Sequence, residues 1–327
     1  MNKGVSTQNV GMEKKPLSPW KKVPPVAWVV LFMIAFFGMT APGFFTTVNF
    51  LNIAVQGSVL LILAVAATLV ILTEGIDLSL GSVLTLAGVT TVLALQQNLP
   101  LPAAVLAGVL TGVVCGAVTG FLITAGKLPP FIATLGMMGM AAGMALVLTR
   151  QGAIYSDLPA FIFLGGGSVG RVPIPTALAV LVFILAWVVL YQTDFGRYII
   201  SIGGNEPGTR LSGVNTHGWK FLTYVVAGGL AALGGVIMSA RLHAADPIVG
   251  NGWEFDAIAA TILGGTSFEK GNGSLGGTVL GVLLITVLRN GLNVIGVGAM
   301  WQPALIGLVI IGAIVFDVLL KQRGIIQ

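Results

Sequence analysis

The sequence has 327 residues, of which 56% are hydrophobic and only 8% are charged, and its mean hydropathy is +0.98. Apolar runs of about 20 residues, the length that crosses the hydrocarbon core of a bilayer as a helix, recur along the chain. This composition excludes a soluble globular domain and predicts an all-α polytopic membrane protein. The net charge of +5 does not indicate nucleic-acid binding, because the basic residues lie scattered at segment ends and form no cluster.

The chain divides into two polar tails and a membrane domain that spans residues 23–320. We expect residues 1–22 to be a disordered cytoplasmic tail. A cleaved signal peptide is not expected, because this stretch is too long for the charged n-region and the apolar run after it is longer than a typical h-region. Residues 321–327 form the second tail. Ten apolar segments are predicted between them, at 23–41, 53–73, 80–95, 101–125, 129–149, 173–191, 221–240, 255–268, 274–292 and 301–320. The eighth segment, with about fourteen residues before Glu269, is short for a full crossing.

Lysine and arginine predict the orientation of these segments. If the N-terminus is cytoplasmic, most basic residues fall in inner loops and tails, and only Arg150, Arg171 and Arg241 fall in outer loops. Arg289 lies within the ninth segment. This distribution follows the positive-inside rule, so we expect both termini and residues 192–220 in the cytoplasm.

A weak internal repeat relates the two halves of the chain. Residues 120–136 align without gaps on 291–307, and both stretches bridge one apolar segment to the next. Asp77 opens the third segment after a polar break, as Asp256 opens the eighth. Matching elements lie five segments apart, an odd number, so the halves must be inverted. Inverted halves with interrupted helices are typical of transporters, with the substrate near the midplane.

Glycines recur at regular spacing on the fourth and fifth segments. They are Gly108, Gly112, Gly116 and Gly120 on the fourth segment, and Gly136, Gly139 and Gly143 on the fifth. Small residues at this spacing permit close contact between helices. They favour tight packing within one subunit, and a subunit interface or a moving seam is the alternative.

Polar residues at membrane depth are the candidates for a substrate pathway, because a charge or amide there needs a partner or a watery cavity. The candidates are Asp77, Asp256, Asn290, Asn293, Trp301 and Gln302. Amides pair with sugar hydroxyls and an aromatic face stacks on a sugar ring. The alternatives are that each aspartate caps the helix after it, and that the tryptophan belongs to the interfacial belt.

No motif for metal, nucleotide or catalytic chemistry is present in the sequence. His217 and His243 stand alone in predicted loops, so no metal site is expected. The stretch at 120–127 lacks the spacing of a phosphate-binding loop, and the chain contains neither HExxH nor GxSxG. We therefore expect neither a cofactor nor an enzymatic activity in this chain.

The loop at 192–220 contains the signals of a short cytoplasmic helix. Asn205 is placed to cap it, Pro207 falls in its first turn and Gly213 is placed to end it. Leu211 and Val214 would give this helix an apolar side for a soluble partner. An ordinary cytoplasmic loop is the alternative.

Five ordered motifs resemble the ribose/galactose-type sugar ABC transporter permeases. They are EGIDLSLGS at 74–82, KLPPFIATLG at 127–136, GGNE and RLSGVN within 203–215, EFDAIAA at 254–260 and GGTS at 264–267. The resemblance covers residues 45–318. One departure is Glu74, because the family commonly has glycine there.

The resemblance implies a permease subunit of the bacterial inner membrane, embedded in lipid, that imports a pentose or hexose. It implies a second permease subunit, a cytoplasmic ATP-binding subunit and a periplasmic sugar-binding protein as partners. It also implies that one cytoplasmic stretch is the coupling helix that docks on the ATPase. This stretch comprises Asn205, Glu206, Gly208, Arg210, Leu211, Ser212, Gly213, Val214 and Asn215.

Two other functions remain open at this point. An ion-coupled secondary sugar transporter would work as a single chain and would need buried acids for protons or Na⁺, for which only Asp77 and Asp256 are available. A membrane enzyme is disfavoured by the lack of a catalytic set.

Overall fold

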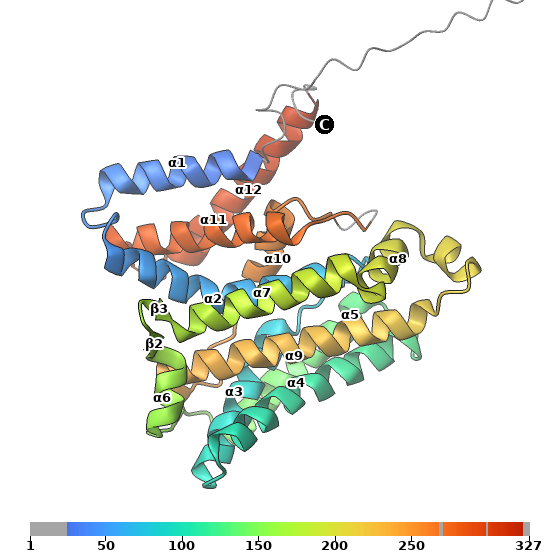
Figure 1. Ribbon diagram of the computed structural model, residues 1–327, viewed down its shortest axis with the longest axis horizontal. Coiled ribbons are helices and arrows are strands. Elements are labelled where there is room, and N and C mark those ends of the chain that lie inside the picture. The colour runs from blue at the N-terminus through green and yellow to red at the C-terminus, as the bar shows by residue number, and fades with distance from the viewer. Residues whose placement is uncertain (1–24, 268–270, 299, 323–327) are drawn as a thin grey trace, which may run out of the picture.

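The computed structural model describes residues 25–267, 271–298 and 300–322, which form twelve α-helices and four strands of two residues each (Figure 1). The N-terminal tail predicted at 1–22, Glu269 and residues 323–327 of the second tail lie outside the described residues. Within them the all-α fold class is confirmed.

Helices occupy each of the first five predicted segments. They are α1 (Pro25–Thr40), α2 (Thr47–Ile71), α3 (Leu80–Gln96), α4 (Leu101–Thr124) and α5 (Pro130–Leu148). The second begins at Thr47 instead of residue 53, because the Thr46 hydroxyl accepts a hydrogen bond from the backbone N–H of Asn49 (3.3 Å) and caps the helix there. The predicted break at 74–79 is present between α2 and α3.

The polar segment at 150–172 contains structure that the sequence did not predict. It holds β1 (Ile154–Tyr155), α6 (Pro159–Gly166), β2 (Ser168–Val169) and β3 (Val172–Pro173). The strand β1 pairs antiparallel with β4 (Ala244–Ala245), and β2 pairs antiparallel with β3. Phe161 of α6 is fully buried. An apolar run of eight residues is too short for a hydropathy signal, so this helix was missed.

Six helices make up the second half of the chain. They are α7 (Ile174–Gln192), α8 (Asp194–Leu211), α9 (Thr216–Leu242), α10 (Trp253–Leu263), α11 (Leu275–Val294) and α12 (Gln302–Gln322). The helix α9 begins at Thr216 instead of residue 221, because the Asn215 side chain accepts from the N–H of Gly218 (3.0 Å). With 11 residues, α10 is shorter than the roughly 20 residues with which a helix alone spans a bilayer, in line with the short eighth segment.

Six helices among the described residues are long and apolar enough to cross a membrane. They are α2, α4, α5, α7, α9 and α11. Shorter apolar helices lie at Val26–Thr40, Leu80–Gln96 and Gln302–Gly312. These helices make the chain a multi-pass membrane protein, and the predicted count of ten crossings is not confirmed by length and composition.

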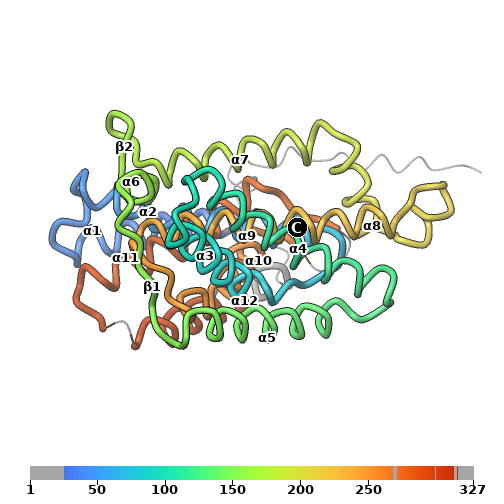
Figure 2. The backbone as a smooth tube through the Cα atoms, turned by 90° about the horizontal axis from the view of Figure 1, so that it is seen from below, coloured from blue at the N-terminus to red at the C-terminus, as the bar shows by residue number. Residues whose placement is uncertain are grey.

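The long helices α2 and α9 form the centre of the fold. The helix α9 packs along α4 and α3, while α2 packs against α7, α10 and α11, and the two central helices also touch each other (Figures 1 and 2). Their side chains supply much of the main buried core, which includes Leu63, Val70, Tyr224 and Ile237. Each central helix therefore has contacts along most of its length.

The glycines of α4 form a close seam with α9. A Cβ atom added at Gly112 would overlap the carbonyl oxygen of Gly228, and one added at Gly228 would overlap the carbonyl oxygen of Gly112. Gly116 likewise lies against the backbone of Tyr224. The glycines of α4 therefore pack inside one chain. Those of α5 differ, because Cβ atoms added at Gly136, Gly139 and Gly143 would meet no atom within 4 Å.

Candidate functional site

The structure confirms the short helix in the loop at 192–220 and adds a helix before it. The backbone of α8 breaks at Asn205 (φ −165°, ψ 89°), which separates residues 194–204 from a short helix at 206–211. The Asn205 side chain caps this short helix by accepting from the N–H of Gly208 (2.9 Å). Gly213 follows it with φ +86°, a conformation that favours glycine.

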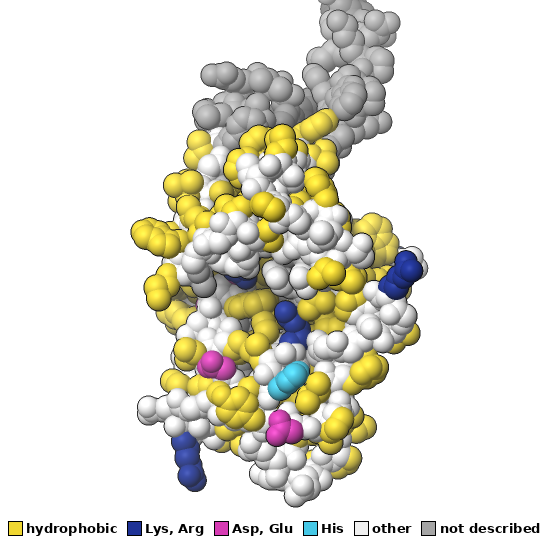
Figure 3. Space-filling model, turned by 90° about the vertical axis from the view of Figure 1, so that its left-hand side faces the viewer, with side chains coloured by type: hydrophobic (Ala, Val, Ile, Leu, Met, Phe, Trp, Pro, Cys, Tyr) yellow, Lys and Arg dark blue, Asp and Glu magenta, His cyan; other side chains and the backbone are white. Residues whose placement is uncertain are grey.

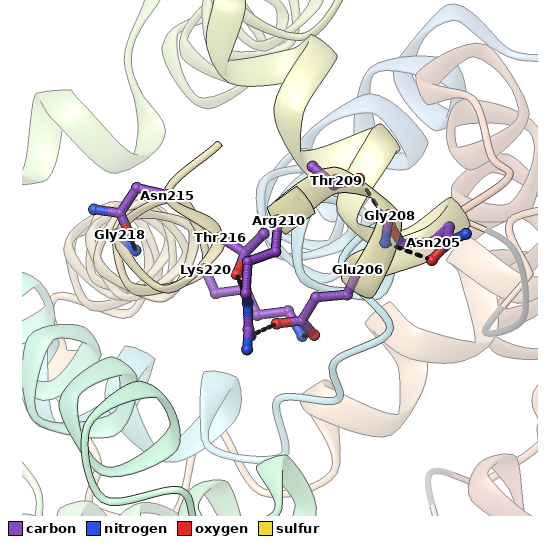
Figure 4. Close-up of polar contacts among 9 residues, drawn as sticks. All are labelled: Asn205, Glu206, Gly208, Thr209, Arg210, Asn215, Thr216, Gly218 and Lys220. Atoms are coloured by element: carbon purple, nitrogen blue, oxygen red, sulfur yellow. Dashed lines mark hydrogen bonds and ion pairs between the residues drawn. The ribbon is translucent and has the colours of Figure 1, made fainter. Parts of the chain in front are cut away.

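Glu206 fastens the short helix to α9 (Figure 4). Its two carboxylate oxygens accept from Arg210 Nη2 (2.8 Å) and from Lys220 Nζ (2.5 Å), and the Nε of Arg210 donates to the hydroxyl of Thr216 (3.3 Å). Burial alone would raise the pKa of Glu206, but the hydrogen bonds and charges of Lys220 and Arg210 outweigh it and lower this pKa below its usual value. Because Lys220 and Thr216 belong to α9, this network links the short helix to a central helix of the fold.

The end of the short helix presents an apolar side chain to solvent. Leu211 is 89% exposed, and Ser212, Gly213 and Asn215 are exposed beside it, whereas Val214 is half-buried. Arg210, which the resemblance places in the same stretch, is paired with Glu206 inside the chain. Leu211 is therefore a large apolar side chain of this helix that is available for contact, beside the exposed Pro207 and Arg210.

The two aspartates at the breaks have separate partners. One carboxylate oxygen of Asp77 accepts from the N–H (2.8 Å) and the hydroxyl (2.6 Å) of Ser79, just before α3. Asp256 lies in the first turn of α10, and its Oδ2 pairs with Nη2 of Arg289 from α11 (2.6 Å). Each aspartate thus lies near the start of a helix, and Asp256 is also half of an ion pair.

The predicted amide and tryptophan set separates into an internal pair and an outer group. Asn290 exchanges two hydrogen bonds with Asn49 of α2 (3.0 and 2.9 Å), and both side chains are buried. Asn293 is exposed and accepts from Nε2 of Gln302 (2.6 Å). Trp301 is 69% exposed. Asn290 therefore already has a partner for its amide in the core, and Asn293 remains at the surface.

A cavity of about 260 Å³ opens between α2, α9, α10 and α11. Its lining residues are Gln56, Leu60, Met238, Arg241, Trp253, Ile285, Thr286, Arg289 and Asn293. Figure 3 shows Lys and Arg side chains set back among hydrophobic ones on the face at the left-hand end of Figure 1. Of the predicted pathway residues only Asn293 lines this cavity, and Asp256 reaches it through Arg289.

Most of the cavity is not predictable from the sequence, because its residues come from four helices and stand alone in apolar runs. The visible signals were Arg289 inside a predicted segment and Gln56 in the apolar run of α2. Among the described residues, no group of three His, Cys, Asp or Glu side chains is placed to hold a metal ion.

The fold defines the class of protein as a multi-pass membrane protein, and comparison with known proteins gives the family. The family described as "Branched-chain amino acid transport system / permease component" matches residues 49–314. This chain belongs to that family.

Several characterised relatives are similar along nearly the whole chain. The ribose import permease protein RbsC of Escherichia coli strain K12 is 40% identical over 317 residues, covering 96% of this chain and 99% of the relative. RbsC of Bacillus subtilis strain 168 is 42% identical over 278 residues, covering 84% and 86%. The D-allose transport system permease protein AlsC of Escherichia coli strain K12 is 36% identical over 315 residues, covering 95% and 96%. No solved structure matches the chain.

Proposed function

We propose that this chain is the permease subunit of an ABC importer that carries a monosaccharide, a pentose or a hexose, across the bacterial inner membrane. The family description names branched-chain amino acids, whereas the relatives that match nearly the whole chain carry names with ribose and allose. The agreement of these relatives over more than nine-tenths of the chain supports a sugar as the substrate.

The observation that carries the mechanism is the short helix at 206–211 with Leu211 exposed at its end. A cytoplasmic ATP-binding subunit would grip this helix in a groove, with Leu211 as the apolar contact. Movement of that subunit would then pass through Glu206 and Lys220 into α9, whose far end lines the cavity. A second permease subunit completes the membrane part, and a periplasmic sugar-binding protein delivers the substrate.

The proposed topology has ten segments in two inverted halves, with both termini in the cytoplasm. The packing supports the inverted halves. The helix α9 contacts α3 and α4, and α2, which lies five segments before α9, contacts α10 and α11, which lie five segments after α3 and α4. The distribution of Lys and Arg supports the orientation. A cysteine at Gly208 should react only with a reagent added to the cytoplasmic side, and one at the exposed Tyr155 only with a reagent added outside. Labelling of both from one side would refute this topology.

Leu211→Asp tests the coupling helix. A carboxylate in an apolar groove is left without a partner, so this variant should lose copurification of the ATP-binding subunit and sugar-stimulated ATP hydrolysis. Val169→Asp is the matched control, since Val169 is also an exposed apolar residue but belongs to β2, far from α8 along the chain. It should retain both activities. Normal copurification and stimulation in Leu211→Asp would contradict the assignment of this helix.

An ion-coupled secondary transporter receives no support from the aspartates. Such a transporter needs an acid that binds and releases a cation during the cycle. Asp256 is paired with Arg289, and Asp77 is bonded to Ser79. Uptake by the purified chain alone in proteoliposomes, driven by a proton or Na⁺ gradient and independent of ATP, would favour that alternative over the importer.

A further inference from the structure

The carboxyl group of Glu254 is buried at the start of α10 without a counter-ion. The residue is only 5% exposed, and no Lys, Arg or His side chain in the described part of the chain forms an ion pair with it. Its Oε1 accepts a hydrogen bond from the backbone N–H of Gly252 (3.3 Å), whereas its Oε2 is buried with no partner. An ionised carboxylate out of water is costly unless a cation or several donors compensate it. One oxygen of this carboxyl group therefore has no compensation.

The unpartnered oxygen lies beside another hydrogen-bond acceptor. A Cβ atom added at Gly81 of α3 would overlap both Oε2 of Glu254 and the carbonyl oxygen of Gly250, so these two oxygens face the same small space. Neither an ionised carboxylate nor a carbonyl group has a hydrogen to donate. Two such oxygens side by side repel each other unless a hydrogen atom lies between them.

We propose that Glu254 is a proton-binding site, which in the folded protein carries a proton on Oε2 and donates a hydrogen bond to the carbonyl oxygen of Gly250. That carbonyl oxygen accepts one bond from the N–H of Trp253 (3.2 Å), and its second lone pair is available. The protonated group still accepts from Gly252 through Oε1. Protonation also removes the charge, and with it most of the cost of burial. The site goes beyond the proposed function, because the proton is present without any substrate.

A proton on Glu254 completes a polar network between α10 and α3. The N–H of Gly250 donates to the hydroxyl of Thr85 (3.0 Å), which donates to the carbonyl oxygen of Gly81 (3.0 Å). A Cβ atom added at Gly250 would overlap the carbonyl oxygen of Gly81, so the two backbones are in direct contact. The proton therefore helps to hold the start of α10, where Trp253 lines the cavity, against α3.

The charges on neighbouring elements also disfavour an ionised Glu254. Among the helices packed against α10, the cation whose side chain the structure describes is Arg289 of α11, and it pairs with Asp256 (2.6 Å). The helices α2 and α3 contain no charged residue. The partial positive charge at the start of α10 favours an anion, but it supplies an N–H to Oε1 only. The other charged residues near α3 and α10 or on α12 are Asp77 before α3, Asp246 before α10, and Asp317 and Lys321 in the last two turns of α12.

Infrared spectroscopy of the purified full-length chain in lipid vesicles tests for the proton. Exposed carboxyl groups are ionised at neutral pH, so a carboxylic-acid C=O stretching band at that pH reports a buried protonated group. The band should shift when the side-chain carboxyl groups of glutamate carry a heavy carbon isotope, which separates it from any aspartic acid. It should be absent from Glu254→Gln. Glu206→Gln is the matched control and should retain the band, because Glu206 is paired with Lys220 and Arg210.

Thermal unfolding against pH tests what the proton stabilises. The amide of Glu254→Gln can donate to Gly250 from the same position, so at neutral pH this variant should unfold at the temperature of wild type. Glu254→Ala has no donor and should unfold several degrees lower. Stability falls as the pH rises wherever the folded state binds more protons than the unfolded state. Wild type should therefore lose stability relative to Glu254→Gln as the pH is raised above neutral.

Each outcome decides a part of the proposal. A wild-type spectrum without a glutamic-acid band at neutral pH overturns it, even if Glu254→Gln does not fold, and so does a band that Glu254→Gln retains. If the band is lost in Glu254→Gln but the two proteins unfold at the same temperature at every pH, the proton does not hold α10 against α3. None of these measurements uses a sugar or an ATP-binding subunit, so their outcome is independent of the proposed function.

Discussion

The polar groups near the two ends of α9 differ in whether they have hydrogen-bond or ion-pair partners inside the chain. Near its start, Lys220 belongs to a network in which Glu206 and Arg210 each have a partner inside the chain. Near its end, Arg241 lines a cavity whose wall contains unpaired buried atoms of Gln56 and Thr286. Paired groups stabilise one arrangement of the chain, whereas unpaired groups are costly until a ligand arrives. The start of α9 is therefore held by ion pairs, whereas its end lies beside a cavity and near buried polar atoms without partners.

The ion pair beside the cavity should be the most costly contact to break. Arg289→Leu leaves the carboxylate of Asp256, whose side chain is 14% exposed, without its cation. We expect a loss of about 3 kcal/mol in the free energy of unfolding, and loss of uptake. The double variant Arg289→Leu/Asp256→Leu should recover much of the stability without recovering uptake. Thermal unfolding of the purified variants measures both. Equal stability of Arg289→Leu and wild type would show that the cavity wall does not depend on this pair.

The asparagine pair tests whether a satisfied amide at membrane depth serves the substrate. Asn49→Leu alone leaves the buried amide of Asn290 without this partner and should lower the free energy of unfolding by about 1–3 kcal/mol. The double variant Asn49→Leu/Asn290→Leu removes both amides and should be close to wild type in stability and in sugar uptake. Stability is read from thermal unfolding, and uptake from labelled sugar. A double variant that is stable but takes up no sugar would show that the asparagine pair contributes to the substrate pathway.

The weakest effect is expected in the network around Glu206, because its ion pairs are partly exposed. Glu206→Gln should cost about 1 kcal/mol locally, seen as faster amide exchange of residues 206–211, with slower ATP-driven uptake. The pKa of Glu206 is lowered in the folded protein from its usual 4.5. Its contribution is therefore present above pH 4.5 and is lost as the pH falls through the lower, folded pKa.

Amide exchange measured against pH therefore checks this prediction. In wild type, protection of residues 206–211, after correction for the intrinsic exchange rate, should fall below that pH, and in Glu206→Gln it should not change there. Ser212→Ala, beside the network but outside it, serves as the control. Protection in wild type that stays constant on acidification would show that Glu206 does not hold the helix.

Hydropathy predicts where most helices lie, because a bilayer requires long apolar runs with satisfied backbones. It placed α3, α4 and α7 within a residue or two. It missed α6 and residues 194–204 of α8, which are short, and whose burial depends on neighbours distant in sequence. In residues 194–204 of α8, Phe195, Ile199 and Ile202 are buried. Their helical spacing is visible in the sequence and indicates a helix there.

The candidate sites were predictable only where the signal is local. Caps and breaks such as Asn205 and Gly213 follow from neighbouring residues, and the structure confirms them. The pairing of Asn290 with Asn49 joins residues 241 positions apart, and no pattern in a single sequence specifies it. The cavity is harder still, because four helices each contribute one or a few side chains to it.

The glycine seam between α4 and α9 restricts how this protein can work as a machine. With 27 residues, α9 is about 40 Å long, and over much of that length α4 lies backbone to backbone against it. The facing carbonyl groups of Gly112 and Gly228 leave no clearance, so neither helix can slide past the other without a collision. We therefore expect α4 and α9 to move together as one rigid unit. In the importer proposed above, we therefore expect the transport cycle to move the other helices relative to α4 and α9.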